Sequence, residues 1–231
     1  MRIVPYRKPV QKVKRRTLDQ AQIVRAALEL LDEVGLDELT MRRVAERLDV
    51  KAASLYRHVR DKQELLVLLG DEISSEIPPV ASQGSWRSQL TQMARNVRSV
   101  FAAHRDTARL LAETPPMGPR RLKHIESLLC LLKDAGLKPQ DACRVAYHCN
   151  NFLTEFAADE ARLASMAAAS GVSKRKLLDQ AQKTFRSLPR QEYPTLVAWA
   201  EFLIEDDPDG LFEFGLRVWL DGIADIVKRR V

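Results

Sequence analysis

Residues 40–62, TMRRVAERLDVKAASLYRHVRDK, decide the fold of the first part of this chain. Thr40 suits the N-cap of a short helix, because its hydroxyl can accept an unpaired first-turn N–H. Residues 49–51 interrupt the helical pattern, and Leu55 and Val59 then lie one turn apart on a second short helix. The apolar stripe of the first helix consists of Val44, Ala45 and Leu48. Two short helices joined by a tight turn predict a helix-turn-helix, whose second helix enters the major groove of DNA.

The preceding segment, residues 17–35, predicts the helix that supports this pair. Thr17 and Gln20 have the spacing of a capping box, and Gly35 stands where a helix commonly ends. The apolar residues at helical spacing between them are Ile23, Ala26, Ala27, Leu30, Leu31 and Val34.

From Thr17 to about Leu69 the chain closely resembles the DNA-binding domain of the TetR family of repressors. The motifs that carry this resemblance are AALELLDEVG at 26–35, LT at 39–40, RRVAERLDV at 42–50 and SLYRHVRDKQELL at 54–66. A looser resemblance, to the tetracycline-repressor subgroup, extends over most of the chain. It rests on SW at 85–86, HRD at 104–106, LKDAGL at 132–137 and FEFGL at 212–216.

The rest of the sequence predicts helices and shows no convincing strand alternation, so we expect an all-α protein of about ten helices. We expect a basic arm over residues 1–16, a DNA-binding domain with a connector helix over 17–77, and a ligand-binding and dimerisation domain over 78–231. The predicted helices after the helix-turn-helix cover about 62–76, 86–104, 107–113, 120–135, 140–168, 173–185, 194–204 and 209–228.

Charge is concentrated at the beginning of the chain. The net charge is +6, but residues 1–16 carry seven bases and no acid, so the remainder sums to −1. Such an arm is either a solvated tail or a segment that lies on DNA phosphates, and it can be both in turn. No apolar run is long enough to span a membrane, and the first residues lack the apolar core of a secretory signal. Cys130, Cys143 and Cys149 lie in apolar helical patterns and are expected to be buried free thiols, so we expect a cytoplasmic protein without a membrane partner.

Several side chains of the helix-turn-helix are expected to reach DNA. The planar fork of Arg57 suits guanine, and Ala53 can pack on a thymine methyl group. Thr40 is expected to anchor a phosphate, whereas Tyr56 reaches DNA or forms a wall of the small core. The full set of expected DNA-binding residues is Thr40, Arg42, Arg43, Lys51, Ala52, Ala53, Tyr56, Arg57, His58 and Lys62. The resemblance implies phosphate contacts by Tyr56 and Lys62.

Polar residues on the long helix predict a ligand cavity. His148, Asn151, Glu155 and Asp159 follow one another at steps of three, four and four, and buried polar groups are costly unless paired. The resemblance implies that ligand-contacting positions are Met93, Val97, Leu111, Thr114, Leu128, Asn151 and Asp159. The family member that binds a metal–tetracycline complex has His at the position of Leu111, so we expect a more apolar, metal-free effector. Ordinary core packing is the alternative for the apolar positions.

The last helix predicts a dimer interface. Small and apolar residues form a seam on it, and Trp219 supplies a large apolar anchor. The expected interface residues are Leu153, Phe156, Leu211, Gly215, Val218, Trp219, Gly222 and Ile223. The alternative is that this helix packs only within its own subunit.

We find no glycine-rich phosphate loop, HExxH motif or nucleophile beside a histidine, so we expect no enzyme, catalytic residue, metal or cofactor. The expected function is a homodimeric transcriptional repressor that binds a palindromic double-stranded operator and is released by a small molecule. The alternatives are an activator, an effector-independent DNA-organising protein, and an all-α interaction protein that does not bind DNA.

Overall fold

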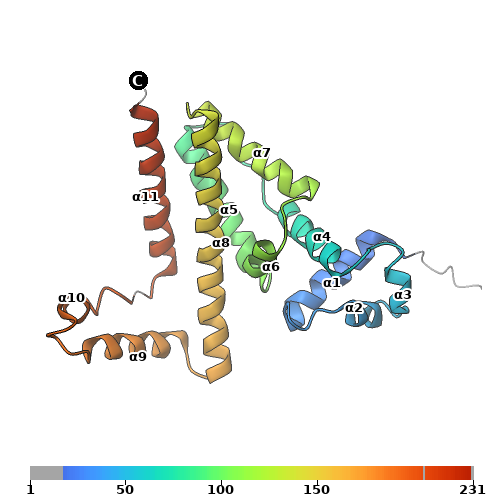
Figure 1. The fold of residues 1–231 in the computed structure, drawn as a ribbon, viewed down its shortest axis with the longest axis horizontal. Coiled ribbons are helices and arrows are strands. Elements are labelled where there is room, and N and C mark those ends of the chain that lie inside the picture. The colour runs from blue at the N-terminus through green and yellow to red at the C-terminus, as the bar shows by residue number, and fades with distance from the viewer. Residues whose placement is uncertain (1–17, 205, 230–231) are drawn as a thin grey trace, which may run out of the picture.

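The computed structural model describes residues 18–204 and 206–229, which form eleven helices and no strand (Figure 1). The predicted all-α class is confirmed. The basic arm 1–16 and Thr17 lie outside the described residues. Among the helices that are described, none is long and apolar enough to cross a membrane.

Helices α1 (Gln20–Val34), α2 (Met41–Arg47) and α3 (Ala52–Leu55) form one end of the molecule. The capping box predicted for the start of α1 was misplaced by two residues. Asp19 is the N-cap and exchanges hydrogen bonds with Gln22, because this pair has the same three-residue spacing. The predicted end is confirmed, since α1 stops at Gly35, whose φ of 82° favours glycine.

Helix α4 (Lys62–Ser75) connects this end to the rest of the chain. Asp61 caps it, and its carboxylate accepts the N–H of Glu64 at 2.8 Å. Leu65, Leu69 and Ile73 of α4 are fully buried in one core that also contains residues of α1, α2, α5 and α6. A movement of α4 therefore displaces side chains of α1 and α2 as well as side chains of α5 and α6.

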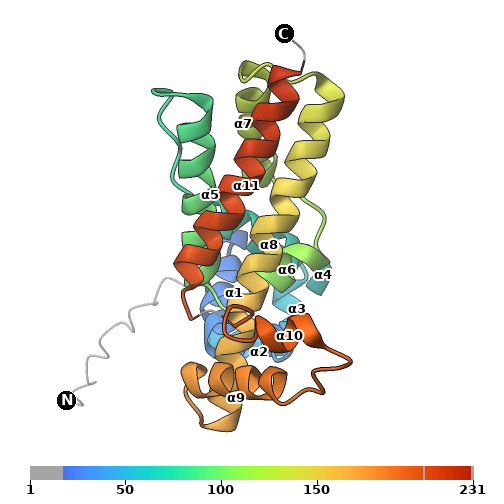
Figure 2. The ribbon, with the colours of Figure 1, turned by 90° about the vertical axis from the view of Figure 1, so that its left-hand side faces the viewer.

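The body consists of α5 (Trp86–Ala103), α6 (Thr107–Glu113), α7 (Pro119–Asp134), α8 (Pro139–Ser170) and α11 (Pro208–Lys228). Helices α8 and α11 run side by side in both views (Figures 1 and 2). A second core joins them to α5 and α7 through Leu90, Leu132, Phe212 and Leu216, each at most 1% exposed.

Helices α9 (Lys174–Arg186) and α10 (Pro194–Ala198) project from the C-terminal end of α8 (Figure 2). The predicted helix at 194–204 was too long: α10 has five residues, and turns follow it. Trp199 and Phe202 are exposed within this subunit, so no core holds those residues in a helix.

The burial of the cysteines was predicted correctly only for Cys149, because Cys130 and Cys143 are exposed. Burial raises the pKa of the Cys149 thiol to about 12, so this side chain stays neutral.

Candidate functional site

The turn between α2 and α3 sets the position of the second short helix. Thr40 caps α2 as predicted, and its hydroxyl accepts the N–H of Arg43 at 3.2 Å. Asp49 then adopts a φ of 52°, a left-handed conformation that Asp tolerates better than most residues. Leu55 and Val59 are buried, as the spacing predicts. The α3 segment, which we define as residues 51–59, therefore directs its other face toward solvent.

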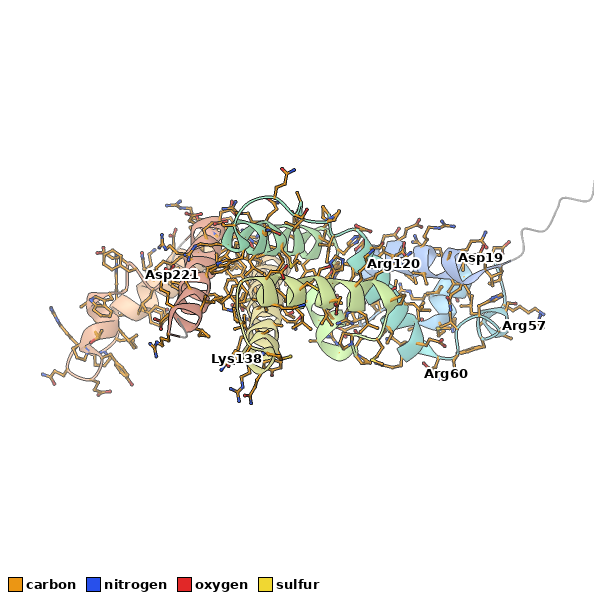
Figure 3. The ribbon with its side chains drawn as sticks, turned by 90° about the horizontal axis from the view of Figure 1, so that it is seen from above. Asp19, Arg57, Arg60, Arg120, Lys138 and Asp221 are labelled. Atoms are coloured by element: carbon orange, nitrogen blue, oxygen red, sulfur yellow. The ribbon has the colours of Figure 1, made fainter. Side chains whose placement is uncertain are left out.

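Exposed side chains cover the outer surface of the α3 segment. Lys51, Ala53 and Arg57 are exposed, and Tyr56 is 53% exposed, which disagrees with a place for this ring in the core wall. Arg57 extends from the end of the molecule opposite α11 (Figure 3). No ion pair within the described residues engages Lys51 or Arg57. Their charges are therefore available to an anionic partner.

Two of the expected DNA-binding residues are less accessible. Ala52 is half-buried and packs against the core, because it begins the helix on the inner side. His58 is also half-buried, and its carbonyl oxygen accepts a hydrogen bond from Gln20 Nε2 at 3.1 Å.

The expected phosphate-binding residues surround this tip. Arg42 pairs with Glu46 at 2.8 Å, and Arg43 pairs with Glu38 at 2.7 Å. Exposed ion pairs contribute little free energy, so either arginine can exchange its carboxylate for a phosphate. Lys62 is half-buried at the first turn of α4.

A partly open cavity of about 760 Å³ lies in the body and is lined by α4, α5, α6, α7, α8 and the loop after α6. Most of its wall is apolar, which is typical of sites for small organic molecules. The expected ligand-binding residues that line it are Met93, Val97, Leu111, Thr114, Leu128, Asn151 and Glu155.

The other two expected ligand-binding residues do not line the cavity. His148 is exposed, and its ring packs edge-on against Tyr147 with centroids 5.5 Å apart. Asp159 is exposed one turn beyond the cavity and pairs with Arg162. Steps of three and four residues keep the four side chains on one face of α8, but the cavity covers only part of that face, so it includes Asn151 and Glu155 and leaves out His148 and Asp159.

Sequence reasoning missed several polar residues of the cavity wall, among them its two basic residues, Arg121 and His124. Both lie on α7, and with Leu128 they follow the spacing of one helical face. That spacing could have indicated from the sequence that Arg121 and His124 face the same side as Leu128. Among the described residues, no group of three or more His, Cys, Asp or Glu side chains is arranged to hold a metal ion.

The expected dimer residues divide into two groups. Leu211 and Val218 are 43% and 55% exposed on α11, and Gly222 also lies on the outside, as does Phe214, which sequence reasoning missed. Trp219 is half-buried and packs partly on the second core.

Four residues of the expected interface are instead directed into their own subunit. Leu153 and Ile223 are buried, Gly215 lies against the ring of Phe152, and Phe156 packs on Phe212 with centroids 5.2 Å apart. Both apolar stripes of α11 have helical periodicity, which does not distinguish the inner stripe from the outer one.

These features define a helix-turn-helix transcriptional regulator with a separate helical domain that holds a cavity. Residues 23–69 match the bacterial regulatory proteins of the tetR family, and residues 78–227 match the tetracyclin repressor-like C-terminal domain. The chain belongs to the TetR family, which consists of transcriptional regulators and not of enzymes. The family prediction is confirmed.

Similar proteins support the same classification. The tetracycline repressor protein class A from transposon 1721 of Escherichia coli is 35% identical over 214 residues, which cover 90% of each chain. The repressor DrrR1 of Streptomyces coeruleorubidus is 29% identical over 93% of this chain and 80% of its own. The structure of the Streptomyces coelicolor TetR family protein ActR in complex with actinorhodin superimposes with a TM-score of 0.81. Its identity is 34%, and the match covers 90% of this chain and 95% of ActR.

Proposed function

We propose that this chain represses transcription as a homodimer on a palindromic double-stranded operator, and that a largely apolar, metal-free small molecule releases it. The observation that carries this proposal is the pairing of an exposed cationic α3 tip with a cavity whose wall includes Ser74 and Ile77, at and just beyond the end of the connector helix. We assign DNA binding to residues 17–77, with the arm 1–16, and ligand binding and dimerisation to residues 78–231. The place of action is the cytoplasm, where bacterial DNA is accessible.

The α3 segment reads bases, and its surroundings hold the backbone. Arg57 donates to guanine, Lys51 lies where base edges come close, and Ala53 packs on a thymine methyl group. Thr40, Arg42, Arg43 and Lys62 contact phosphates, which position the helix but carry no sequence information directly.

Dimerisation follows from the size of the reading element. Helix α3 has four residues, so one copy makes too few base contacts for specific binding. Two copies related by a twofold axis match half-sites about 34–36 Å apart. The outer stripe of α11, defined by Leu211, Phe214, Val218 and Gly222, is the face we assign to the partner subunit.

The effector acts through the connector. A ligand that contacts Ser74 or Ile77 displaces α4, and α4 shares its core with α1 and α2. The ligand shifts the equilibrium only by the difference between its affinities for the two arrangements. A change in the separation of the two α3 segments removes bidentate contacts that are each worth about 1–3 kcal/mol.

The class of effector follows from the cavity wall. Leu111, Met93 and Leu128 present apolar groups, and tight metal chelation requires several nitrogen or oxygen ligands. ActR, which resembles this chain, is known in complex with actinorhodin, an organic ligand. An organic molecule bound without a metal is therefore the effector we propose.

Selection of bound duplexes from a random pool tests the DNA-binding part. We expect a short palindrome and a protected footprint of matching length, and transcription from a promoter that contains it should fall when the protein is added. Uniform coating of DNA would indicate an organising protein, and increased transcription would indicate an activator. Release from the selected duplex is then measured with a panel of organic molecules that includes actinorhodin.

A further inference from the structure

Arg121 is a half-buried cation whose hydrogen bonds all go to neutral groups. Its Nη1 atom donates to Thr114 Oγ1 at 2.9 Å and to the carbonyl oxygens of Thr114 and Pro115 at 3.4 and 3.3 Å. Its Nη2 atom donates to the carbonyl oxygen of Leu111 at 3.4 Å. These acceptors lie at the C-terminal end of α6 and just after it, and they hold the guanidinium at the cavity wall.

No carboxylate within the described residues forms an ion pair with Arg121. The nearby carboxylate of Asp71 uses its Oδ1 atom to accept the backbone N–H groups of Arg120 and Arg121. Burial lowers the pKa of Arg121 from its ordinary value, and the charge of Asp71 opposes this effect. The guanidinium keeps its proton in this setting, so it places a positive charge beside an apolar cavity.

Arg98 is another poorly exposed arginine of this chain, and its ion pairs can be compared with the surroundings of Arg121. Arg98 is 17% exposed, and it pairs with Glu160 at 2.7 Å and with Asp209 at 2.8 Å. Buried charges are normally paired in this way, because an unpaired one is costly. Asp71 is the charged neighbour of Arg121 but is not bonded to the guanidinium, so the contrast indicates that a directly paired anion would come from a bound molecule.

The guanidinium also has donors left for such a partner. The Nε–H makes no hydrogen bond to a described residue, and Nη2 makes one weak bond at 3.4 Å. These two nitrogens form the edge of arginine that receives two oxygens of one anion. Glu155 lies on α8, which forms a different wall from α7, so its charge disfavours an acid at that end of the cavity.

We propose that the effector is an amphipathic organic acid, whose apolar body fills the cavity and whose anionic oxygen group pairs with Arg121. This inference rests on the proposed ligand-binding function of the cavity. It narrows the effector from any apolar molecule to one that carries a carboxylate, a sulfonate or a comparable acidic group.

Two fluorescent dyes test the proposal on the full chain. They are 8-anilinonaphthalene-1-sulfonate and N-phenyl-1-naphthylamine, which share one aromatic framework and differ in the acidic group. We expect the sulfonate dye to bind the unaltered chain about ten-fold more tightly than the neutral dye, as charge-assisted hydrogen bonds predict. Arg121→Gln should weaken binding of the sulfonate dye about ten-fold and change binding of the neutral dye less than two-fold.

Control variants locate the dyes and separate charge from folding. Val97→Trp fills the cavity and should abolish binding of both dyes. Arg190→Gln removes an exposed arginine that lies outside the cavity and should change neither affinity. Arg121→Lys keeps the charge and should retain part of the preference for the sulfonate dye. If Arg121→Gln fails to fold, the comparison of the two dyes on the unaltered chain still decides the question.

The outcomes distinguish this inference from the proposed function. Equal affinity for both dyes in the unaltered chain, or an unchanged preference in Arg121→Gln, overturns the acidic-effector proposal and leaves the cavity as a ligand site. If Val97→Trp leaves the binding of both dyes unchanged, or if neither dye binds at all, the ligand-binding function of the cavity is contradicted. The acidic-effector proposal is then contradicted as well.

Discussion

The carboxylate of Asp71 on the connector helix caps the N-terminus of α7, where its Oδ1 atom accepts the backbone N–H of Arg121 at 3.0 Å. Asp71 is 5% exposed, and it accepts the N–H of Arg120 as well, at 2.8 Å. Gly118, the local N-cap residue of α7, has no side chain to perform this role. A residue of the cavity wall is thus bonded directly to the helix that leads to the DNA-binding domain.

We expect Asp71→Ala to lower the free energy of unfolding by about 1–2 kcal/mol, the usual value of an N-cap. Asp71→Asn should lose less, because its amide oxygen can still accept. Gly118→Ala should destabilise by a similar amount, since a Cβ there would overlap the Asp71 carboxylate. Urea unfolding measures all three. The loss of unfolding free energy caused by Gly118→Ala should be smaller in an Asp71→Ala background. If the two losses are fully additive, the proposed contact between Gly118 and the Asp71 carboxylate is contradicted.

The turn between α5 and α6 holds the DNA-binding domain through His104. Its Nδ1 lies 2.9 Å from Asp32 of α1, and its Nε2 lies 2.9 Å from Glu76, which follows α4. Burial of the imidazole disfavours the proton, but hydrogen bonds to Glu76 and Asp32 outweigh it and raise the pKa of His104 above 6.5. Only the protonated ring donates to both carboxylates at once.

This arrangement predicts a pH-dependent contribution to stability. Because the folded-state pKa is raised, the contribution is fully present below the unfolded value of about 6.5 and is lost as the pH rises through the raised value. We expect His104→Gln to cost about 1 kcal/mol at about pH 6 and clearly less at about pH 8.5. Thermal unfolding of both proteins across this range gives the difference. A constant difference would show that the proton at His104 plays no part.

Base reading by Arg57 is tested against its neighbour Arg60, since both lie at the same tip (Figure 3). Arg57→Ala should relax the preference at one base position of the selected operator by about 1–3 kcal/mol. Arg60 lies near Asp61 and Glu64, at 3.4 and 3.9 Å, so Arg60→Ala should weaken binding slightly and equally for all sequences. Binding to operator variants with single base changes measures both. Equal loss on every sequence for Arg57→Ala would assign this residue to phosphate.

Val218 on the outer stripe of α11 offers the sharpest test of the dimer, because it is exposed in the subunit. Val218→Asp should give a particle with the mass of one chain in light scattering and should weaken operator binding. Leu122→Asp is the matched control, since Leu122 is also exposed, at 46%, but lies on α7. An intact Val218→Asp dimer would place the interface elsewhere. Trp219 is a less suitable position for this test, because its side chain also packs on the second core of its own subunit, so a substitution would also affect folding.

Local sequence signals predicted most of the fold because they act within one or two turns. The cap at Thr40 and the glycine at Gly35 set helix ends that the structure reproduces. The capping box of α1 was displaced because Thr17–Gln20 and Asp19–Gln22 satisfy the same pattern. The helix predicted for residues 194–204 is too long because an apolar run indicates burial but does not show which part of the protein covers it.

The candidate sites were less accessible to sequence reasoning. Periodicity identified the apolar stripes that contain Leu153 and Val218, but the choice between core and partner depends on which helices are neighbours. Arg121 is noticed only once α4, α6 and α7 are seen together, because its acceptors and its cavity come from different helices. Polar residues such as His148 were placed in the cavity because one helix was considered in isolation.

Helix α9 buries none of its side chains in the described subunit. The energetic consequences of changing it are therefore confined to a short appendage, and the two cores do not constrain its composition. Insertions, deletions and exchanges between residues 171 and 204 should be tolerated by the folding of the remainder. Changes there should therefore cost little folding free energy, whereas changes at the contact between Asp71 and the start of α7 disturb packed and hydrogen-bonded groups.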